Sequence, residues 1–83
     1  MNIQHEVDNQ CFLLKQPGLA ESAVLKYRHV TDDTVDFYST FVPPALRNQG
    51  IAEKLVRFGL DWAKRNELTI EASCWYVQKF IRP

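Results

Sequence analysis

Net charge is missing from this sequence, because ten lysines and arginines are matched by ten aspartates and glutamates. A balanced surface has no excess of cations to neutralise phosphates, so it gives no support to nonspecific binding of nucleic acid. No apolar run approaches the roughly 20 residues that cross a bilayer. The polar stretch 1–8 has no hydrophobic segment of the kind that secretion signals carry. We therefore expect no nucleic-acid partner, no membrane partner and a cytoplasmic location.

Cysteine is also scarce. Cys11 and Cys74 allow at most one disulfide, and without a secretion signal we expect two free thiols. His5 and His29 have no partners at metal-ligand spacing, so no metal site is expected. Hydrophobic residues, by contrast, make up 46% of the chain, which is ample for a globular core. We expect one domain over residues 1–83, as a monomer or a weak homodimer.

The order of strand and helix patterns predicts an α/β (α+β) fold. Residues 10–15, 21–30 and 34–42 have the character of strands separated by turns, and the last is the most β-branched and aromatic. From about residue 50 to 65 apolar residues recur with the period of a helix. Residues 68–73 then indicate a strand and 75–81 a short helix. We expect three antiparallel strands leading into a parallel βαβ unit with a short C-terminal helix.

The turn between the strand at 34–42 and the long helix contains Arg47, Gly50 and Ala52. A helix N-terminus has four N–H groups without internal partners and the positive end of the helix dipole, so it can hold a phosphate or pyrophosphate. Gly50 would let an anion approach the backbone, Ala52 keeps the first turn slim, and Arg47 adds a positive charge. An ordinary loop that needs a small residue has the same pattern, and three positions alone do not separate the two interpretations.

A family resemblance favours the anion-binding interpretation. Arg47-x-x-Gly50-x-Ala52 after a strand resembles the acetyl-CoA motif of the GNAT superfamily of N-acetyltransferases. Val42-Pro43, before this motif, and the later block Cys-Trp-Tyr-Val-Gln-Lys-Phe at 74–80 are similar to its smallest members, the YjdJ-type and NATD-like proteins. The similarity extends over roughly residues 11–82.

The resemblance implies a minimal GNAT-like fold, in which the sheet splays between two parallel strands and the pantetheine of acetyl-CoA enters the gap. Backbone groups of Phe41 and Val42 would pair with the pantetheine amides, and the pyrophosphate would rest on the amides of residues 48–52. The implied residues for binding acetyl-CoA are Phe41, Val42, Arg47, Asn48, Gln49, Gly50, Ile51 and Ala52.

Two residues of the second block are candidates for catalysis. Cys74 would lie near the acetyl thioester, either lining the pocket or acting as a nucleophile, with Lys79 one helical turn away to favour the thiolate. The alternative for Cys74 is a small buried hydrophobe. Tyr76 could protonate the leaving thiolate, a task that tyrosine performs in many GNAT enzymes. The alternative for Tyr76 is packing of the terminal helix against the sheet.

The resemblance leaves two functions open. Relatives often place a histidine and an acidic residue around the threonine before Val-Pro, whereas Ser39 and Phe41 flank Thr40 here. The chain is therefore either an N-acetyltransferase or a module that binds acetyl-CoA or CoA as a sensor or interaction domain, without transfer chemistry. The acceptor of an enzyme would be an amine: a protein lysine, an N-terminus or a small molecule. A structural domain without ligand is hard to reconcile with both blocks.

Overall fold

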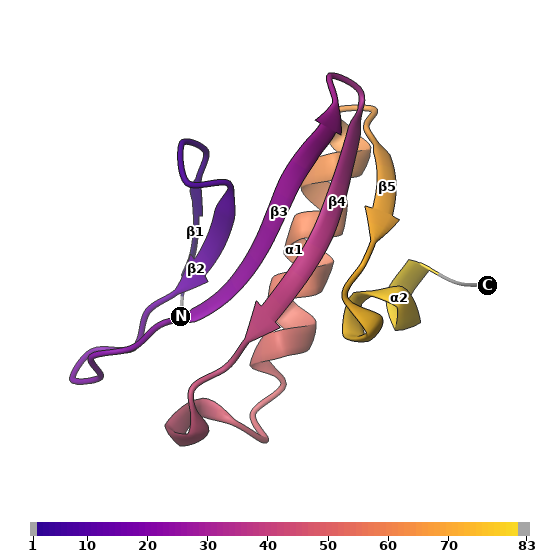
Figure 1. The fold of residues 1–83 in the computed structure, drawn as a ribbon. Helices are drawn as coiled ribbons and strands as arrows, with labels where there is room; N and C mark the ends of the chain where they lie inside the picture. The colour runs from indigo at the N-terminus through magenta and orange to yellow at the C-terminus, as the bar shows by residue number, and fades with distance from the viewer. Residues whose placement is uncertain (1, 82–83) are drawn as a thin grey trace.

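The computed structural model describes residues 2–81 and shows a five-stranded mixed sheet with its longest helix packed on one face (Figure 1). The strands follow one another in the sheet in chain order, with β1 to β4 antiparallel and β5 parallel to β4. The elements are β1 (Ile3–Glu6), β2 (Cys11–Leu14), β3 (Ala23–Thr31), β4 (Thr34–Phe41), the 3-10 helix η1 (Pro44–Leu46), α1 (Ile51–Arg65), β5 (Thr69–Ala72) and α2 (Trp75–Ile81). The predicted α+β architecture is confirmed, including the parallel βαβ unit and the terminal helix.

The prediction of three antiparallel strands was wrong by one, because β1 was not expected. Its sequence is short and polar, and only alternate side chains turn inward. His5 stacks on Phe12 with ring centroids 4.2 Å apart, and its Nε2 lies 2.7 Å from the Tyr27 hydroxyl. An imidazole thus occupies the position that an apolar residue usually takes in an edge strand. The hydrophobic pattern of residues 3–6 is therefore too weak to predict a strand there.

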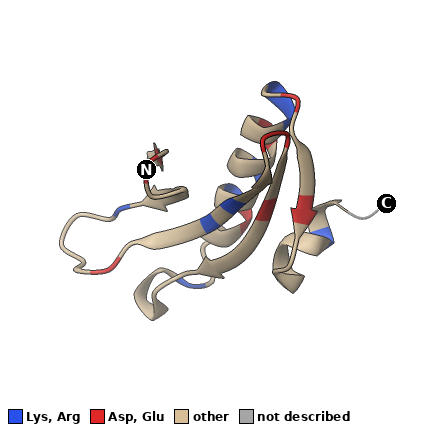
Figure 2. Ribbon diagram, turned by 45° about the horizontal axis from the view of Figure 1, so that its top comes forward, with Lys and Arg blue, Asp and Glu red and all other residues tan. Residues whose placement is uncertain are grey.

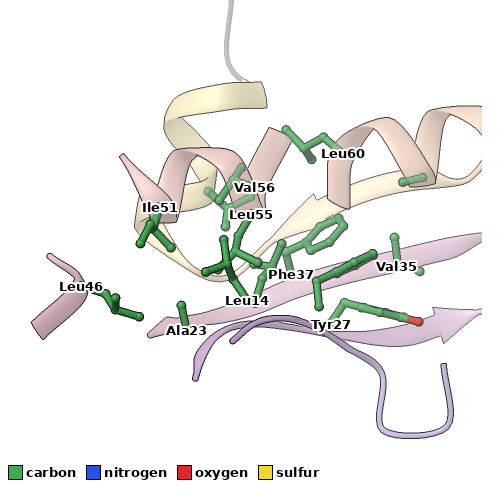
Figure 3. Packing of buried hydrophobic residues seen from close by; sticks show 14 residues of the cluster. Leu14, Ala23, Tyr27, Val35, Phe37, Leu46, Ile51, Leu55, Val56 and Leu60 are labelled. Atoms are coloured by element: carbon green, nitrogen blue, oxygen red, sulfur yellow. The ribbon is translucent and has the colours of Figure 1, made fainter. Parts of the chain in front are cut away.

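The core lies between the sheet and α1 (Figure 3). Strand alternation places Leu25 and Tyr27 of β3 in this core while Lys26 and Arg28 face solvent. The helix contributes a stripe of buried residues at helical spacing, as its periodicity predicts. These are Ile51, Leu55, Val56, Gly59, Leu60 and Ala63. Among residues 2–81, no helix is long and apolar enough to span a membrane.

Gly59 lets α1 approach the sheet closely. A Cβ built on it would stand 2.8 Å from Leu25 Cδ2 and 3.0 Å from Phe37 Cε1. Both side chains are fully buried, so neither can move aside freely. A glycine in the middle of a helix costs helix propensity, and here the close packing explains why it is present.

The two parallel strands pair over a short distance and then diverge. Thr34–Phe37 of β4 faces Thr69–Ala72 of β5, and the Cys74 N–H then donates to the Phe37 carbonyl at 3.1 Å. Beyond that point β4 continues to Phe41, while the segment that follows β5 turns into α2 (Figure 1). The last strand was predicted to run from residue 68 to residue 73. Instead β5 ends at Ala72, and the carbonyl of Cys74 accepts the first hydrogen bond of α2.

A β-bulge re-aims the outer half of β4. Tyr27 faces Phe37 and Lys26 faces Ser39, so the register gives Tyr38 no partner of its own among the described residues. A bulge of this kind bends the strand and increases its twist. The bulge begins where the pairing with β5 ends, and residues 38–41 of β4 have no pairing with β5.

Candidate functional site

The turn from β4 into α1 is shaped by two residues with positive φ, Asn48 at 66° and Gly50 at 73°. Asparagine enters the left-handed region more readily than most residues, and glycine enters it without a steric penalty. A Cβ on Gly50 would meet no described atom within 4 Å. Glycine is therefore required here by backbone conformation, and the space beside it is open.

The N-terminus of α1 has free hydrogen-bond donors. Its cap residue is Gly50, and the described residues supply no side-chain hydrogen bond to the cap. The first bond that closes the helix runs from the Lys54 N–H to the Gly50 carbonyl at 3.1 Å. The N–H groups of Ile51, Ala52 and Glu53 precede that bond and have no partner within the helix. Together with the helix dipole they favour an anion at this end.

The same turn lines a pocket of about 330 Å³, a volume at the lower end for small-molecule sites. Its walls are formed by Val42, Leu46, Arg47, Asn48, Gly50, Ile51, Ala52, Glu53 and Tyr76. The structure thus brings the residues predicted to bind the cofactor together with Tyr76, from opposite ends of the C-terminal half. Within the part of the chain that is described, Phe41 and Gln49 stay outside this lining.

Arg47 and Gln49 hold the shape of the turn. Arg47 Nε donates to the Val42 carbonyl at 2.9 Å, and Gln49 Nε2 donates to the Ala45 carbonyl at 3.4 Å. Arg47 is exposed, so its charge lies at the rim of the pocket, where the sequence places it. The Val42 carbonyl already accepts one hydrogen bond, which leaves it one lone pair for a ligand amide. Phe41 is partly exposed and faces Val24 at the end of β4.

The lining fits an anion in most respects. Unpaired N–H groups, the cation of Arg47 and the open space at Gly50 favour a phosphate group. Glu53 opposes it, since its carboxylate lines the same pocket. That charge is offset by Arg57, whose Nε lies 2.8 Å from Glu53 Oε2.

The environment of Tyr76 is relevant to both roles that its sequence context suggests, proton donation and packing. Burial and the negative charge of Glu53 raise the pKa of its phenol above the ordinary value. The hydroxyl therefore stays protonated at neutral pH and remains able to donate a proton. The ring also packs against Phe80 with centroids 5.4 Å apart, and Lys79 Nζ lies 5.1 Å from its centroid.

Cys74 lies outside the pocket lining, at the point where β4 and β5 separate. Its sulfur is half-buried and lies 3.6 Å from Thr40 Oγ1. Burial by itself would raise the pKa of the thiol, but hydrogen bonds from the backbone of Val77 and Tyr76 and from Thr40 outweigh it, so the pKa is lowered. Cys11, the other free cysteine, is buried, and desolvation raises its pKa.

The expectation that Lys79 favours the thiolate was wrong. Its ammonium lies 5.1 Å from the ring centroid of Trp75 and at the same distance from that of Tyr76. The groups that lower the pKa of Cys74 are the first N–H groups of α2 and the residue opposite on β4. The turn of helix that separates Lys79 from Cys74 in the sequence thus directs the cation onto aromatic rings rather than onto sulfur.

Three residues near the site were not singled out from the sequence. Glu53 lines the pocket, Thr40 contacts Cys74, and Asp36 is a fully buried carboxylate on β4. The sequence could have indicated Asp36, because it is a charged residue inside a run of aromatic and β-branched residues. Such a residue needs a partner if it is buried. Nothing in the sequence indicated Thr40, since threonine is common in strands.

Comparison with a family model gives a match over most of the chain. Residues 11–83 match the model described as GCN5-related N-acetyl-transferase. A solved structure agrees with it. The solution structure of a GCN5-like protein from Staphylococcus aureus superposes with a TM-score of 0.74 and 25% identity, over 96% of this chain and 76% of that one.

Similar curated proteins come from vertebrates. Protein NATD1 of Xenopus tropicalis is 33% identical over 82 residues, covering 99% of this chain and 75% of its own length. Protein NATD1 of Bos taurus is 34% identical over 82 residues, covering 99% of this chain and 73% of its own length. The family model covers residues 11–83, and these similarities cover nearly all of this chain. The chain therefore belongs to the GCN5-related N-acetyltransferase family.

Proposed function

We propose that this chain binds acetyl-CoA in the pocket between the β4–α1 turn and Tyr76 and transfers its acetyl group to an amine. The observation that carries the proposal is the convergence of three features at one edge of the sheet. These are the uncapped N-terminus of α1, the pocket beside it, and the divergence of β4 from β5. Ligands of open α/β sheets bind at the carboxyl ends of parallel strands.

Binding would use mostly backbone groups. The N–H groups from Asn48 to Ala52 would hold the pyrophosphate, with Arg47 at the rim. The outer half of β4 would pair with the pantetheine amides through Phe41 and the remaining lone pair of the Val42 carbonyl. The end of the β4–β5 pairing at Phe37 supports this role, because residues 38–41 of β4 have no pairing with β5.

Acetyl-CoA supplies an activated thioester. The protein has to orient this thioester and provide a proton for the departing sulfur. The amine nitrogen bonds to the acetyl carbon as the carbon–sulfur bond breaks, and the amine proton leaves to solvent. Tyr76, whose phenol is protonated at neutral pH, supplies a proton to the departing sulfur and regains one from solvent. Cys74 lies at the strand divergence, outside the lining of the pocket, and direct attack by the amine requires no acetyl group on it.

A second function is supported by one feature. Ser39 and Phe41 flank Thr40, so this part of β4 carries no imidazole or carboxylate to serve as a base. His5, on β1, packs instead against Phe12 and Trp62. A protein that binds acetyl-CoA or CoA without transferring the acetyl group would have the same pocket.

An acceptor screen separates the two functions. Peptides with a free N-terminus, peptides with an internal lysine and small primary amines are each incubated with acetyl-CoA, and released thiol is measured. An enzyme gives acceptor-dependent thiol release that falls at least about tenfold in Tyr76→Phe, with acetyl-CoA affinity unchanged. A binding module gives the same affinity and thiol release no faster than the buffer control with every amine.

A further inference from the structure

Asp36 is the one buried charged side chain in the described core, at 2% exposure, and neither the pocket nor the proposed chemistry uses it. It lies on β4 between Val35 and Phe37, and its side chain is directed to the sheet face opposite α1. There it stands directly across from Arg28 of β3 on one side and Glu71 of β5 on the other. Figure 2 shows this row of basic positions on β3 and acidic positions on β4 and β5.

The carboxylate ties β4 to the residue just before Cys74. Oδ1 accepts the backbone N–H of Ser73 at 2.7 Å, and Oδ2 accepts the Ser73 hydroxyl at 2.7 Å. Arg28 Nη2 lies 3.1 Å from Oδ2 on the solvent side. Both carboxylate oxygens are therefore engaged, and charge-assisted bonds of this length are strong.

The position of these bonds in the sheet is informative. The register of β4 with β5 ends at Phe37 and Ala72, and Ser73 is the next residue. The Ser73 N–H goes to the Asp36 side chain, and the Cys74 N–H goes to the Phe37 carbonyl at 3.1 Å. Two consecutive N–H groups are thus anchored at the strand divergence, and from there the Cys74 sulfur reaches Thr40.

A contribution to stability does not by itself explain why a carboxylate is buried at this position. A buried ion pair is often no better for stability than well-packed apolar residues, because desolvation opposes the attraction. Its value lies in fixing a unique geometry, and the geometry fixed here is the departure of the chain from β5 into α2. An error of about 1 Å at such a place is enough to slow a transfer reaction about 100-fold.

We propose that Asp36, through its two hydrogen bonds to Ser73, is a positioning residue that sets the gap between β4 and β5 and orients Cys74 within it. The inference rests on the proposed function for its catalytic consequence, since the gap is where the acetyl thioester would lie. The geometric part stands without any ligand and can be measured on the free protein.

The test is site-resolved alkylation of the two cysteines with iodoacetamide over a series of pH values, quantified by peptide mass spectrometry. Cys11 is an internal reference for overall loosening of the fold. It is buried in β2, which is separated from β4 in the sheet by β3. The variants are Ser73→Ala, which removes one bond at an exposed position, and Asp36→Asn, which keeps the side-chain volume. Ser73→Thr retains both bonds and is the matched control.

We expect Ser73→Ala and Asp36→Asn to displace Cys74 from the N–H groups of α2. The pH profile of Cys74 alkylation then shifts to higher pH. The alkylation rate at neutral pH falls about fivefold, as the loss of one hydrogen bond predicts. Ser73→Thr should behave as wild type, and Cys11 should be unchanged in all three. Unchanged Cys74 profiles in both altered variants would overturn the proposal, as would a parallel increase at Cys11 and Cys74.

A second measurement connects this geometry to transfer. With the best acceptor, Ser73→Ala should reduce kcat about tenfold while KM and Kd for acetyl-CoA stay within about threefold of wild type. An unchanged kcat would contradict the catalytic part of the proposal. Wild-type protein that fails to bind acetyl-CoA would refute the proposed function instead, and the alkylation result would still decide the geometric part.

Discussion

Cys74 Sγ and Thr40 Oγ1 lie 3.6 Å apart and connect the start of α2 to the outer half of β4. The contact crosses the place where the two parallel strands have stopped pairing. It helps to lower the pKa of the thiol, with the first backbone N–H groups of α2. We therefore expect the thiol of Cys74 to be more reactive than that of Cys11, whose pKa is raised by burial.

Thr40→Val should raise the pKa of Cys74, because it removes the hydroxyl and keeps the shape of the side chain. At neutral pH the thiolate fraction falls, and alkylation of Cys74 should slow by about threefold to fivefold. Thr40→Ser, which keeps the hydroxyl, is the control and should stay near wild type. The pH profile of alkylation measures the effect, and identical profiles for Val and Ser would show that the contact has no influence on the thiol.

Gly50→Glu and Gly50→Gln separate charge from backbone strain. Both place a side chain on a residue with φ 73°, so both carry the same left-handed strain of about 1–2 kcal/mol. Only glutamate puts a negative charge where the pyrophosphate would lie. We expect Gly50→Glu to weaken acetyl-CoA binding at least about tenfold more than Gly50→Gln, measured by calorimetry on folded protein. Equal affinities would place the phosphate groups elsewhere.

Gly59→Ala should destabilise the fold even though alanine is the better helix former. The gain in helix propensity is about 1 kcal/mol, whereas overpacking of a filled core costs about 1–3 kcal/mol. The new methyl would meet Leu25 Cδ2 at 2.8 Å. Thermal unfolding should show a lower Tm for Gly59→Ala, and part of the loss should return in the double variant Leu25→Val/Gly59→Ala. A higher Tm for the single variant would mean that α1 shifts outward at little cost.

Asp36 predicts how stability depends on acid. Burial raises the pKa of its carboxyl, but the bonds from Ser73 and the charge of Arg28 outweigh that effect and lower it below 3.8. The folded protein therefore binds this proton less readily than the unfolded chain. Its contribution to stability is complete above the ordinary pKa and is lost as pH falls through the folded value.

Asp36→Asn should accordingly be less stable than wild type at pH 7, by about 1–3 kcal/mol, and the difference should shrink below about pH 4. Denaturant unfolding at several pH values measures it. Asp61→Asn is the matched control, because Asp61 forms an exposed pair with Arg65 at 2.9 Å that contributes at most about 1 kcal/mol. A pH-independent difference between wild type and Asp36→Asn would contradict the lowered pKa.

Much of the fold followed from periodicity, and the exceptions have physical causes. The strand at 34–42, the long helix and the terminal helix have strong patterns, and the structure places all three within one residue of expectation. β1 was missed because His5 takes an apolar place through ring stacking. The end of β5 was misplaced because Asp36 accepts the Ser73 N–H, and a side chain that replaces a ladder bond leaves no periodic signal.

The site was predicted to the extent that it is local in sequence. Arg47, Gly50 and Ala52 form one turn, so their proximity required no tertiary information. Resemblance suggested Tyr76 separately, and only the fold shows that it closes the same pocket. The groups that act on Cys74 depend on the orientation of α2 and on a bulge at Tyr38, and neither is encoded in spacing along the chain.

Binding of acetyl-CoA is measured by titration calorimetry on the folded protein. We expect saturable binding of one acetyl-CoA per chain, abolished or strongly weakened in Gly50→Glu. Ligand at about 100 times Kd should then add roughly 2.7 kcal/mol of stability, which corresponds to a rise in Tm of about ten degrees or more for a domain of this size. No binding heat and no rise in Tm at millimolar acetyl-CoA, with the wild-type protein folded, would contradict the proposed function.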